Sequence, residues 1–108
     1  MQKLSLQELT ALILEQAKQK GFGTQPDEVH VAEKIALIHA EVSEAYEAYR
    51  HKKLDGPHGF AEELGDVIQR VLHLAGVFNI DMEKAILQKL QNNKDREWKW
   101  DEMHEGHA

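Results

Sequence analysis

AEVSEAYEAYR (residues 40–50) and AEELGDVIQRVLHLAG (residues 61–76) are the two stretches that decide how this chain folds. Apolar residues recur through both at the spacing of an α-helix. Each stretch also carries two acidic residues three positions apart, which are Glu41 with Glu44 and Glu63 with Asp66. Residues at that spacing lie on one face of a helix, one turn from each other. The sequence therefore predicts two helices, each with a pair of carboxylates on one face.

The helix faces that carry these pairs are largely apolar, and a helix turns such a face toward the core. Glu41 falls near Leu37, Ile38 and Ala45 on the helical wheel, and Glu63 falls near Val67. Ionised carboxylates in apolar surroundings are costly unless something neutralises them.

Three kinds of neutralisation are open to the acidic pairs. The carboxyl groups could take up protons, pair with a cation such as Arg70, or share divalent metal ions, which prefer oxygen ligands. Only metal binding uses all four together. A single acidic pair is more typical of a solvated face, whereas two pairs among apolar neighbours favour a metal site.

Length and composition limit the remaining choices. At 108 residues the chain is expected to form one domain, residues 1–108. It has no cysteine, which agrees with a reducing compartment. Its apolar runs are too short for a membrane span, and MQKLSLQELT lacks the regions of a signal peptide. With a net charge of −6 and no long basic segment, nucleic-acid binding is disfavoured. We expect a cytoplasmic protein without membrane or nucleic-acid partners.

Helical periodicity predicts four helices, at residues 5–20, about 27–51, 60–78, and from 82 toward Trp98. Ser5 and Glu8 have the spacing of a capping box, and Asp81 is a candidate N-cap. Gly65, between two acidic positions, indicates a close backbone approach, room for a ligand, or a glycine that the helix merely tolerates. No segment reads as a strand. The predicted fold is all-α, a bundle of four helices with short connections.

Three segments of the sequence resemble one known family. They are EKIALIHAEVSEAYEAYR (33–50), EELGDVIQRVLHLAGVFNIDMEKAI (62–86) and KLQNNKDREW (89–98). They are similar to the MazG-like all-α nucleoside triphosphate pyrophosphohydrolases, whose pattern is ExxE, then ExxD, then a Lys/Asn/Arg cluster. The resemblance covers roughly residues 28–98 and implies a domain core at about 27–98, with a frayed tail at 101–108. EWKWDEMHEGHA (97–108) departs from the family's frequent proline-tyrosine and His-Gly ending.

The resemblance implies hydrolysis of a nucleoside or deoxynucleoside triphosphate between the α and β phosphates, giving the monophosphate and pyrophosphate. Such an enzyme would clean the nucleotide pool and would use Mg²⁺, with Mn²⁺ as a substitute. By position, the metal ligands would be Glu41, Glu44, Glu63 and Asp66. The residues that match the family's cluster for phosphate and sugar are Lys89, Asn93 and Arg96, with Lys94 as a further candidate. Family members are dimers or dimers of dimers, so a homodimer or homotetramer is expected to complete the fold and the site.

The residue inventory favours attack by an activated water molecule over a covalent intermediate, because the chain has no cysteine and no Gly-x-Ser-x-Gly motif. A divalent ion would stabilise charge on the phosphates and activate the water. A carboxylate could accept the proton of that water, and Glu44 beside Glu41 is the candidate. Trp98 could stack on a nucleobase, or it could pack against the bundle or a partner subunit.

A second function class agrees with the same sequence. The departure after Arg96 and the broad apolar surface of the first helix favour a helical module without catalysis. Such a module would bind a nucleotide or a protein partner in a regulatory role. A module of this kind has no structural need for four buried carboxylates, and the enzyme is therefore the first hypothesis.

Overall fold

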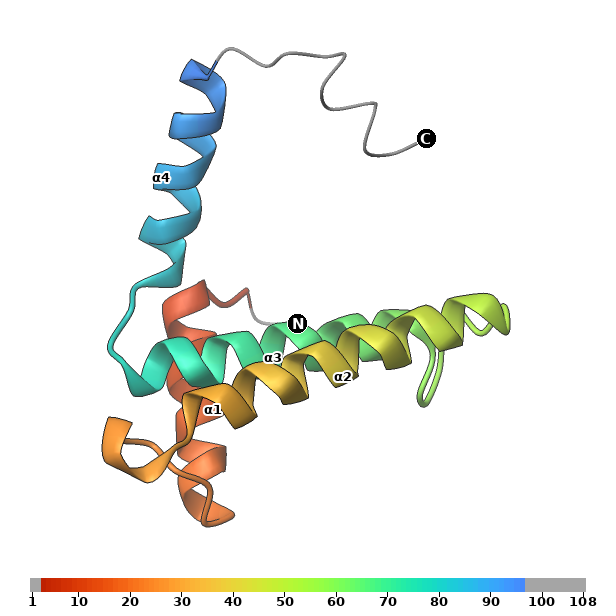
Figure 1. Cartoon of the computed structure of the whole chain (residues 1–108), viewed down its shortest axis with the longest axis horizontal. Helices are drawn as coiled ribbons and strands as arrows, with labels where there is room; N and C mark the ends of the chain where they lie inside the picture. Colours follow the sequence, from red (N-terminus) through yellow and green to blue (C-terminus); the bar gives the residue numbers. More distant parts are fainter. Residues whose placement is uncertain (1–2, 97–108) are drawn as a thin grey trace.

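The structure, a computed structural model, describes residues 3–96 of the chain. In these residues it contains four α-helices, one short 3-10 helix and no strand (Figure 1). The elements in chain order are α1 (Leu6–Gln19), η1 (Pro26–Glu28), α2 (Val31–Arg50), α3 (Phe60–Val77) and α4 (Met82–Asp95). The all-α class and the four helices of the prediction are confirmed.

Helix α1 begins and ends where its sequence signals predict. Glu8 donates its backbone N–H to Ser5 Oγ at 3.1 Å, and Ser5 returns its own N–H to Glu8 Oε1 at 3.1 Å. This reciprocal pair is the capping box. At the other end Gly21 adopts a φ of +78°, and Phe22 N–H donates to Ala17 O at 2.8 Å. The left-handed glycine thus ends the helix and turns the chain toward η1.

The start of α2 differs from its predicted position, whereas the start of α4 agrees with the prediction. The prediction starts the second helix near Asp27, but residues 26–28 form the separate 3-10 turn and α2 begins at Val31. Pro26 fixes the first turn of η1 instead of α2. The N-cap of α4 is Asp81 as predicted, with Oδ1 accepting Lys84 N–H at 3.0 Å. Helix α4 ends at Asp95, and Trp98 and the tail 101–108 lie outside the described residues.

Helices α2 and α3 form an antiparallel pair, and α1 crosses α3 near its end (Figure 1). The crossing point is Gly76, where an added Cβ would lie 2.8 Å from Leu14 Cδ1 and 2.9 Å from Thr10 Cγ2. Helix α4 packs mainly against α1 and leads away from the α2–α3 pair. The radius of gyration is 16.5 Å, compared with about 13 Å for a compact chain of this size. One chain therefore has an open shape, and closure of the bundle stays a prediction about the assembly.

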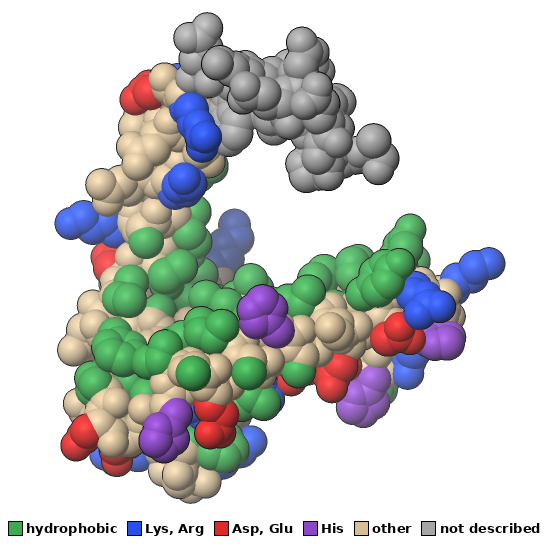
Figure 2. Space-filling model, in the orientation of Figure 1, with side chains coloured by type: hydrophobic (Ala, Val, Ile, Leu, Met, Phe, Trp, Pro, Cys, Tyr) green, Lys and Arg blue, Asp and Glu red, His purple; other side chains and the backbone are tan. Residues whose placement is uncertain are grey.

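The apolar core of this open chain is small and consists mostly of alanine. The buried apolar residues among those described are Ala17, Ala45, Ala48, Leu72, Ala75 and Val77. Many larger apolar side chains are exposed, including a stripe along α2 made of Val31, Ile35, Val42, Tyr46 and Tyr49, which we call the α2 stripe. Figure 2 shows hydrophobic side chains gathered along one edge of the α2–α3 pair. None of the described helices has the length and apolar character that crossing a bilayer would need.

Candidate metal centre

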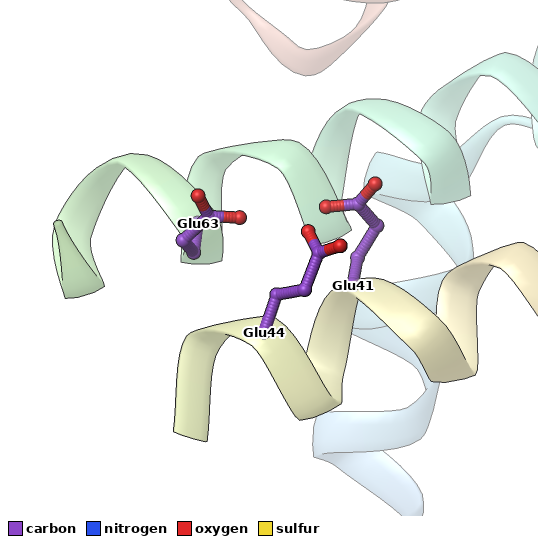
Figure 3. A group of neighbouring side chains, drawn as sticks. All are labelled: Glu41, Glu44 and Glu63. Atoms are coloured by element: carbon purple, nitrogen blue, oxygen red, sulfur yellow. The ribbon is translucent and has the colours of Figure 1, made fainter. Parts of the chain in front are cut away.

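Three of the four predicted acidic ligands meet between α2 and α3. Glu41 and Glu44 project from successive turns of α2, and Glu63 projects toward them from the first turn of α3 (Figure 3). One carboxylate oxygen from each residue lies within 4.8 Å of the others. The spacing of three residues places the α2 pair on one face, and the antiparallel packing brings that face to the start of α3. The structure thus brings Glu41, Glu44 and Glu63 together, as the sequence predicted for these three residues.

The burial of the three carboxylates is unequal. The side chains of Glu63 and Glu41 are 7 % and 12 % exposed, while Glu44 is an exposed residue. Two buried oxygens, Glu41 Oε2 and Glu63 Oε2, have no hydrogen-bond partner among the described residues. Buried polar atoms are almost always satisfied, so a pair of orphaned carboxylate oxygens in one group indicates a missing partner. An all-carboxylate donor set fits a hard divalent cation such as Mg²⁺.

The other oxygen of each of these two carboxylates lies near a basic side chain. Arg70 Nε donates to Glu41 Oε1 at 3.0 Å, and His58 Nδ1 lies 3.7 Å from Glu63 Oε1. Arg70 comes from the middle of α3, and His58 comes from the loop before that helix. The centre therefore has a guanidinium on one side and an imidazole on the other, and its two buried oxygens have no partner among the described residues.

Asp66, the fourth predicted ligand, does not belong to the acidic group among the described residues. It lines a cleft of about 250 Å³ that opens beside Glu41, between α1 and α3. The cleft is lined by Ile13, Gln16, Ala17, Lys20, Phe22, Glu41, Asp66, Gln69, Arg70 and His73. The ligand role of Asp66 stays a prediction, and the structure places this residue and Glu41 in the wall of the same cleft.

A second hollow, of about 370 Å³, adjoins the acidic group on its other side. Glu44 forms part of its wall, together with residues of the α2 end and of the following loop, which are Ser43, Glu47, Ala48, His51, Lys53 and His58. The acidic group thus lies between a cleft with aromatic and amide side chains and a hollow with imidazole and ammonium groups.

The predicted phosphate-binding residues lie on α4, apart from the acidic group. Lys89 and Lys94 are exposed, Asn93 is half-buried, and Arg96 follows the last residue of the helix. Because α4 leads away from the α2–α3 pair (Figure 1), the chain by itself does not bring these residues to the carboxylates. Trp98, the predicted stacking residue, is outside the described residues.

Two features of the centre have no clear signal in the sequence. His58 reaches Glu63 because the loop turns sharply at this residue, whose φ is +60°, and a loop conformation of this kind has no periodic pattern to reveal it. Phe22, Gln16 and Gln69 come together only because α1 crosses α3. Arg70 differs, because its position one turn after Asp66 makes it a visible candidate for pairing with a carboxylate.

Comparisons with protein-family models, with curated proteins and with solved structures find no match for this chain.

Proposed function

We propose that this chain is a Mg²⁺-dependent pyrophosphohydrolase of the MazG-like kind, which cleaves nucleoside or deoxynucleoside triphosphates between the α and β phosphates. The observation that carries the proposal is the convergence of Glu41, Glu44 and Glu63 with two buried oxygens that lack partners. The order and spacing of the acidic pairs, with the later Lys89, Asn93 and Arg96, support the same assignment. Mn²⁺ would substitute for Mg²⁺, and the enzyme would act on free cytoplasmic nucleotides.

The side chains of the centre would have separate roles in the reaction. Glu41 and Glu63, both buried, would hold the cation, and Asp66 would join them from the adjoining cleft wall. The bound cation would supply charge stabilisation for the phosphates and an activated water. Glu44 is the carboxylate of the group that is open to solvent, so it is the one best able to accept a proton and release it. Arg70, which now faces Glu41, would keep the site balanced before the cation binds.

A second copy of the chain completes the proposed enzyme. The α2 stripe is an unpaired apolar surface on a chain with an alanine-rich core, and surfaces of this kind mark interfaces. In a homodimer or homotetramer, α4 of one copy would bring Lys89, Lys94, Asn93 and Arg96 to the acidic group of another. The two cations and the amide would then hold the triphosphate and sugar.

The alternative proposal is a helical module that binds nucleotide or a protein without turnover. The separation of α4 from the acidic group within one chain favours it, because the expected cation cluster and carboxylates do not meet there. The module would bind triphosphate in the presence of Mg²⁺ but form no product.

A product assay decides between these proposals. The purified protein is incubated with each common NTP and dNTP and Mg²⁺, and the phosphate products are resolved. We expect monophosphate and pyrophosphate from the wild type, no product from Glu41→Gln, and full activity from Glu33→Gln, an exposed glutamate of the same helix. Diphosphate with orthophosphate would reject cleavage between the α and β phosphates. Binding without any product would favour the module.

A further inference from the structure

The cleft between α1 and α3 has the composition of a site for a flat, polar ring. Its walls combine apolar side chains, Ile13, Ala17 and Phe22, with the amides of Gln16 and Gln69. Glu41 is shared with the acidic group, so the cleft is continuous with the candidate metal centre. A cavity with a few polar groups among apolar walls is typical of small-molecule sites.

Phe22 is held in place at this cleft although its side chain is open to solvent. The residue is 57 % exposed, and its backbone N–H donates to Ala17 O at 2.8 Å. The carbonyl oxygen of the next residue, Gly23, accepts a hydrogen bond from His73 Nε2 of α3 at 2.7 Å. A Cβ on Gly23 would lie 2.6 Å from Glu28 O, so the loop is tightly folded on η1. An exposed aromatic ring in a cleft, on a backbone that is held in place, is a ready surface for stacking.

The two glutamines face the same cleft from different helices. Gln16 comes from α1 and Gln69 from α3, and both residues are exposed. Neither side-chain amide has a hydrogen-bond partner among the described residues. A primary amide offers both donors and an acceptor, which are the groups needed to hydrogen-bond the edge of a nucleobase.

The side chains on the two sides of the acidic group give the substrate a direction. The hollow that Glu44 lines contains His51, Lys53 and His58, whose N–H groups can donate to phosphate oxygens, together with the carboxylate of Glu47, which lies 3.4 Å from His51 Nε2. The cleft contains Lys20 and Arg70 as cations and Glu41 and Asp66 as carboxylates, and Arg70 is already paired with Glu41. The aromatic ring and the amides distinguish the cleft from the hollow.

We propose that the cleft between α1 and α3 is the nucleobase subsite, with Phe22 as the stacking surface and Gln16 and Gln69 as the groups that select the base. This inference rests on the proposed pyrophosphohydrolase, whose substrate would lie with its base in the cleft and its terminal phosphate toward His51, Lys53 and His58. Base selectivity then depends on α1 and α3 of the chain that carries the carboxylates.

The kinetic test compares Phe22→Ala with Phe78→Ala, the same change at an exposed phenylalanine outside the cleft. We expect Phe22→Ala to raise KM by about tenfold or more, with kcat nearly unchanged and with the control like the wild type. Gln69→Leu should alter the ratio of kcat/KM values between bases. Unchanged KM and unchanged base ratios in an active enzyme would overturn the inference and leave the activity in place.

A binding test separates failure of the subsite from failure of the proposed function. The Glu41→Gln protein, which is expected to be inactive, is titrated with nucleoside monophosphates and with ribose 5-phosphate, and the side-chain amide NMR signals of Gln16 and Gln69 are followed. Shifts that need the base, and that Phe22→Ala reduces, support the subsite even if no nucleotide is hydrolysed. Equal shifts with ribose 5-phosphate, or none with any monophosphate, would overturn it.

Discussion

Glu41 illustrates at the residue scale how the candidate metal centre is balanced. One of its oxygens accepts from Arg70, and the other is buried without a partner. The chain also contains an exposed pair of the same type, Arg50 with Glu47 at 2.8 Å, in which both side chains are more than half exposed. Exposed ion pairs contribute little to stability. In the Arg70–Glu41 pair the side chains are 40 % and 12 % exposed, so loss of Arg70 leaves a largely desolvated carboxylate without its cation.

Arg70→Met should therefore lower the free energy of unfolding by about 1–3 kcal/mol in the absence of divalent ions. Arg50→Met is the matched control and should cost less than about 1 kcal/mol. Chemical denaturation of both variants measures the difference. Added Mg²⁺ should restore most of the stability lost in Arg70→Met, because a bound cation takes over the charge of the guanidinium. Equal losses in the two variants would show that Glu41 does not depend on Arg70.

Glu63 and its neighbour Glu62 offer a similar comparison for metal binding. Glu63 is 5 % exposed within the acidic group, whereas Glu62 is exposed and lies outside it. A ligand that binds only the folded state stabilises it by about 2.7 kcal/mol at a concentration of one hundred times Kd. We expect Mg²⁺ to raise the Tm of the wild type and of Glu62→Gln, and to have little effect on Glu63→Gln. A full Mg²⁺ response in Glu63→Gln would remove this residue from the centre.

The sequence predicted Glu41 and Glu44 as neighbours because helical spacing places both on one face. It grouped them with Glu63 because a shared metal ion would neutralise all of these carboxylates. It could not decide among the partners of these carboxylates. Pairing with Arg70 and binding of a metal were separate alternatives, and the structure places Arg70 on one oxygen of Glu41 while leaving the other free for a further partner. The position of Asp66 in the cleft depends on the register of α2 against α3, which spacing along one helix does not determine.

At the scale of elements, two glycines of α3 have opposite surroundings. A Cβ on Gly65 would meet nothing within 4 Å, whereas one on Gly76 would lie 2.8 Å from Leu14 and 2.9 Å from Thr10. Of the explanations that the sequence leaves open for Gly65, close backbone approach is excluded among the described residues of one chain, and room for a ligand or simple tolerance of the glycine remains. The close approach occurs instead at Gly76, where α1 crosses α3.

Alanine at these two positions should change stability in opposite directions. Gly65→Ala should raise the free energy of unfolding by up to about 1 kcal/mol, since alanine is the better helix former. Gly76→Ala should lower it by about 1–3 kcal/mol, because the added methyl group overpacks the crossing. Thermal and denaturant unfolding of both variants measure the two effects. Destabilisation by Gly65→Ala would mean that this position is not open in solution.

The start of α1 provides a pH-dependent contribution to stability. The hydrogen bond from the backbone N–H of Ser5 lowers the pKa of Glu8 below the ordinary value of 4.5, and a hydrogen bond with the Ser5 side chain lowers it by a smaller amount. A carboxyl group whose pKa is lower in the folded state stabilises that state above the ordinary value and loses this effect as the pH falls through the folded-state value. The capping box should therefore weaken in acid.

Glu8→Gln tests this expectation. As the pH is lowered from neutral to about pH 3, the unfolding free energy of the wild type should fall more steeply than that of the variant. The two curves should separate mainly below about pH 4.5, where the unfolded-state carboxyl binds its proton. Parallel curves throughout would show that the Ser5 hydrogen bond to Glu8 does not persist in solution.

Helix existence was predictable because each helix has apolar periodicity and local end signals such as the Ser5 capping box and Asp81. The start of α2 was harder to predict. Pro26 and Asp27 favour a helical first turn, but the chain makes a 3-10 turn there and restarts at Val31. Local sequence signals hardly distinguish a single 3-10 turn from a single α-helical turn. In the structure the 3-10 turn occurs together with close packing of Gly23 against Glu28 and Val29.

At the scale of the whole molecule, most of the large apolar side chains of the described residues are exposed. The α2 stripe and several leucines of α1 and α4 are exposed, while alanines dominate the core. Periodicity marked Val31, Ile35 and Val42 as one face of a helix but could not say whether that face packs within the chain or against another copy. The predicted assembly accounts for this surface.

Mixing two inactive variants tests the assembly together with the position of its active sites. If α4 acts on the acidic group of another copy, Glu41→Gln and Lys89→Ala should complement each other after unfolding and joint refolding. A homodimer mixed at random should recover about a quarter of the wild-type active sites. Glu41→Gln mixed with Glu44→Gln is the control and should stay inactive, because neither site would be intact. Native mass spectrometry identifies the mixed dimers. If these dimers recover no activity, α4 does not act on the acidic group of the partner.

Because the core is rich in alanine, we expect the stability of the fold to depend on protein concentration. In the proposed assembly, a chain that buries so few large side chains by itself would gain most of its hydrophobic stabilisation from a second copy, and folding would then be coupled to association. We expect the Tm to rise with protein concentration, and proteases to cleave the dilute protein faster than the concentrated one. In a cell, the amount synthesised would then set the fraction that is folded, and a sparse protein of this kind would be removed before it could act.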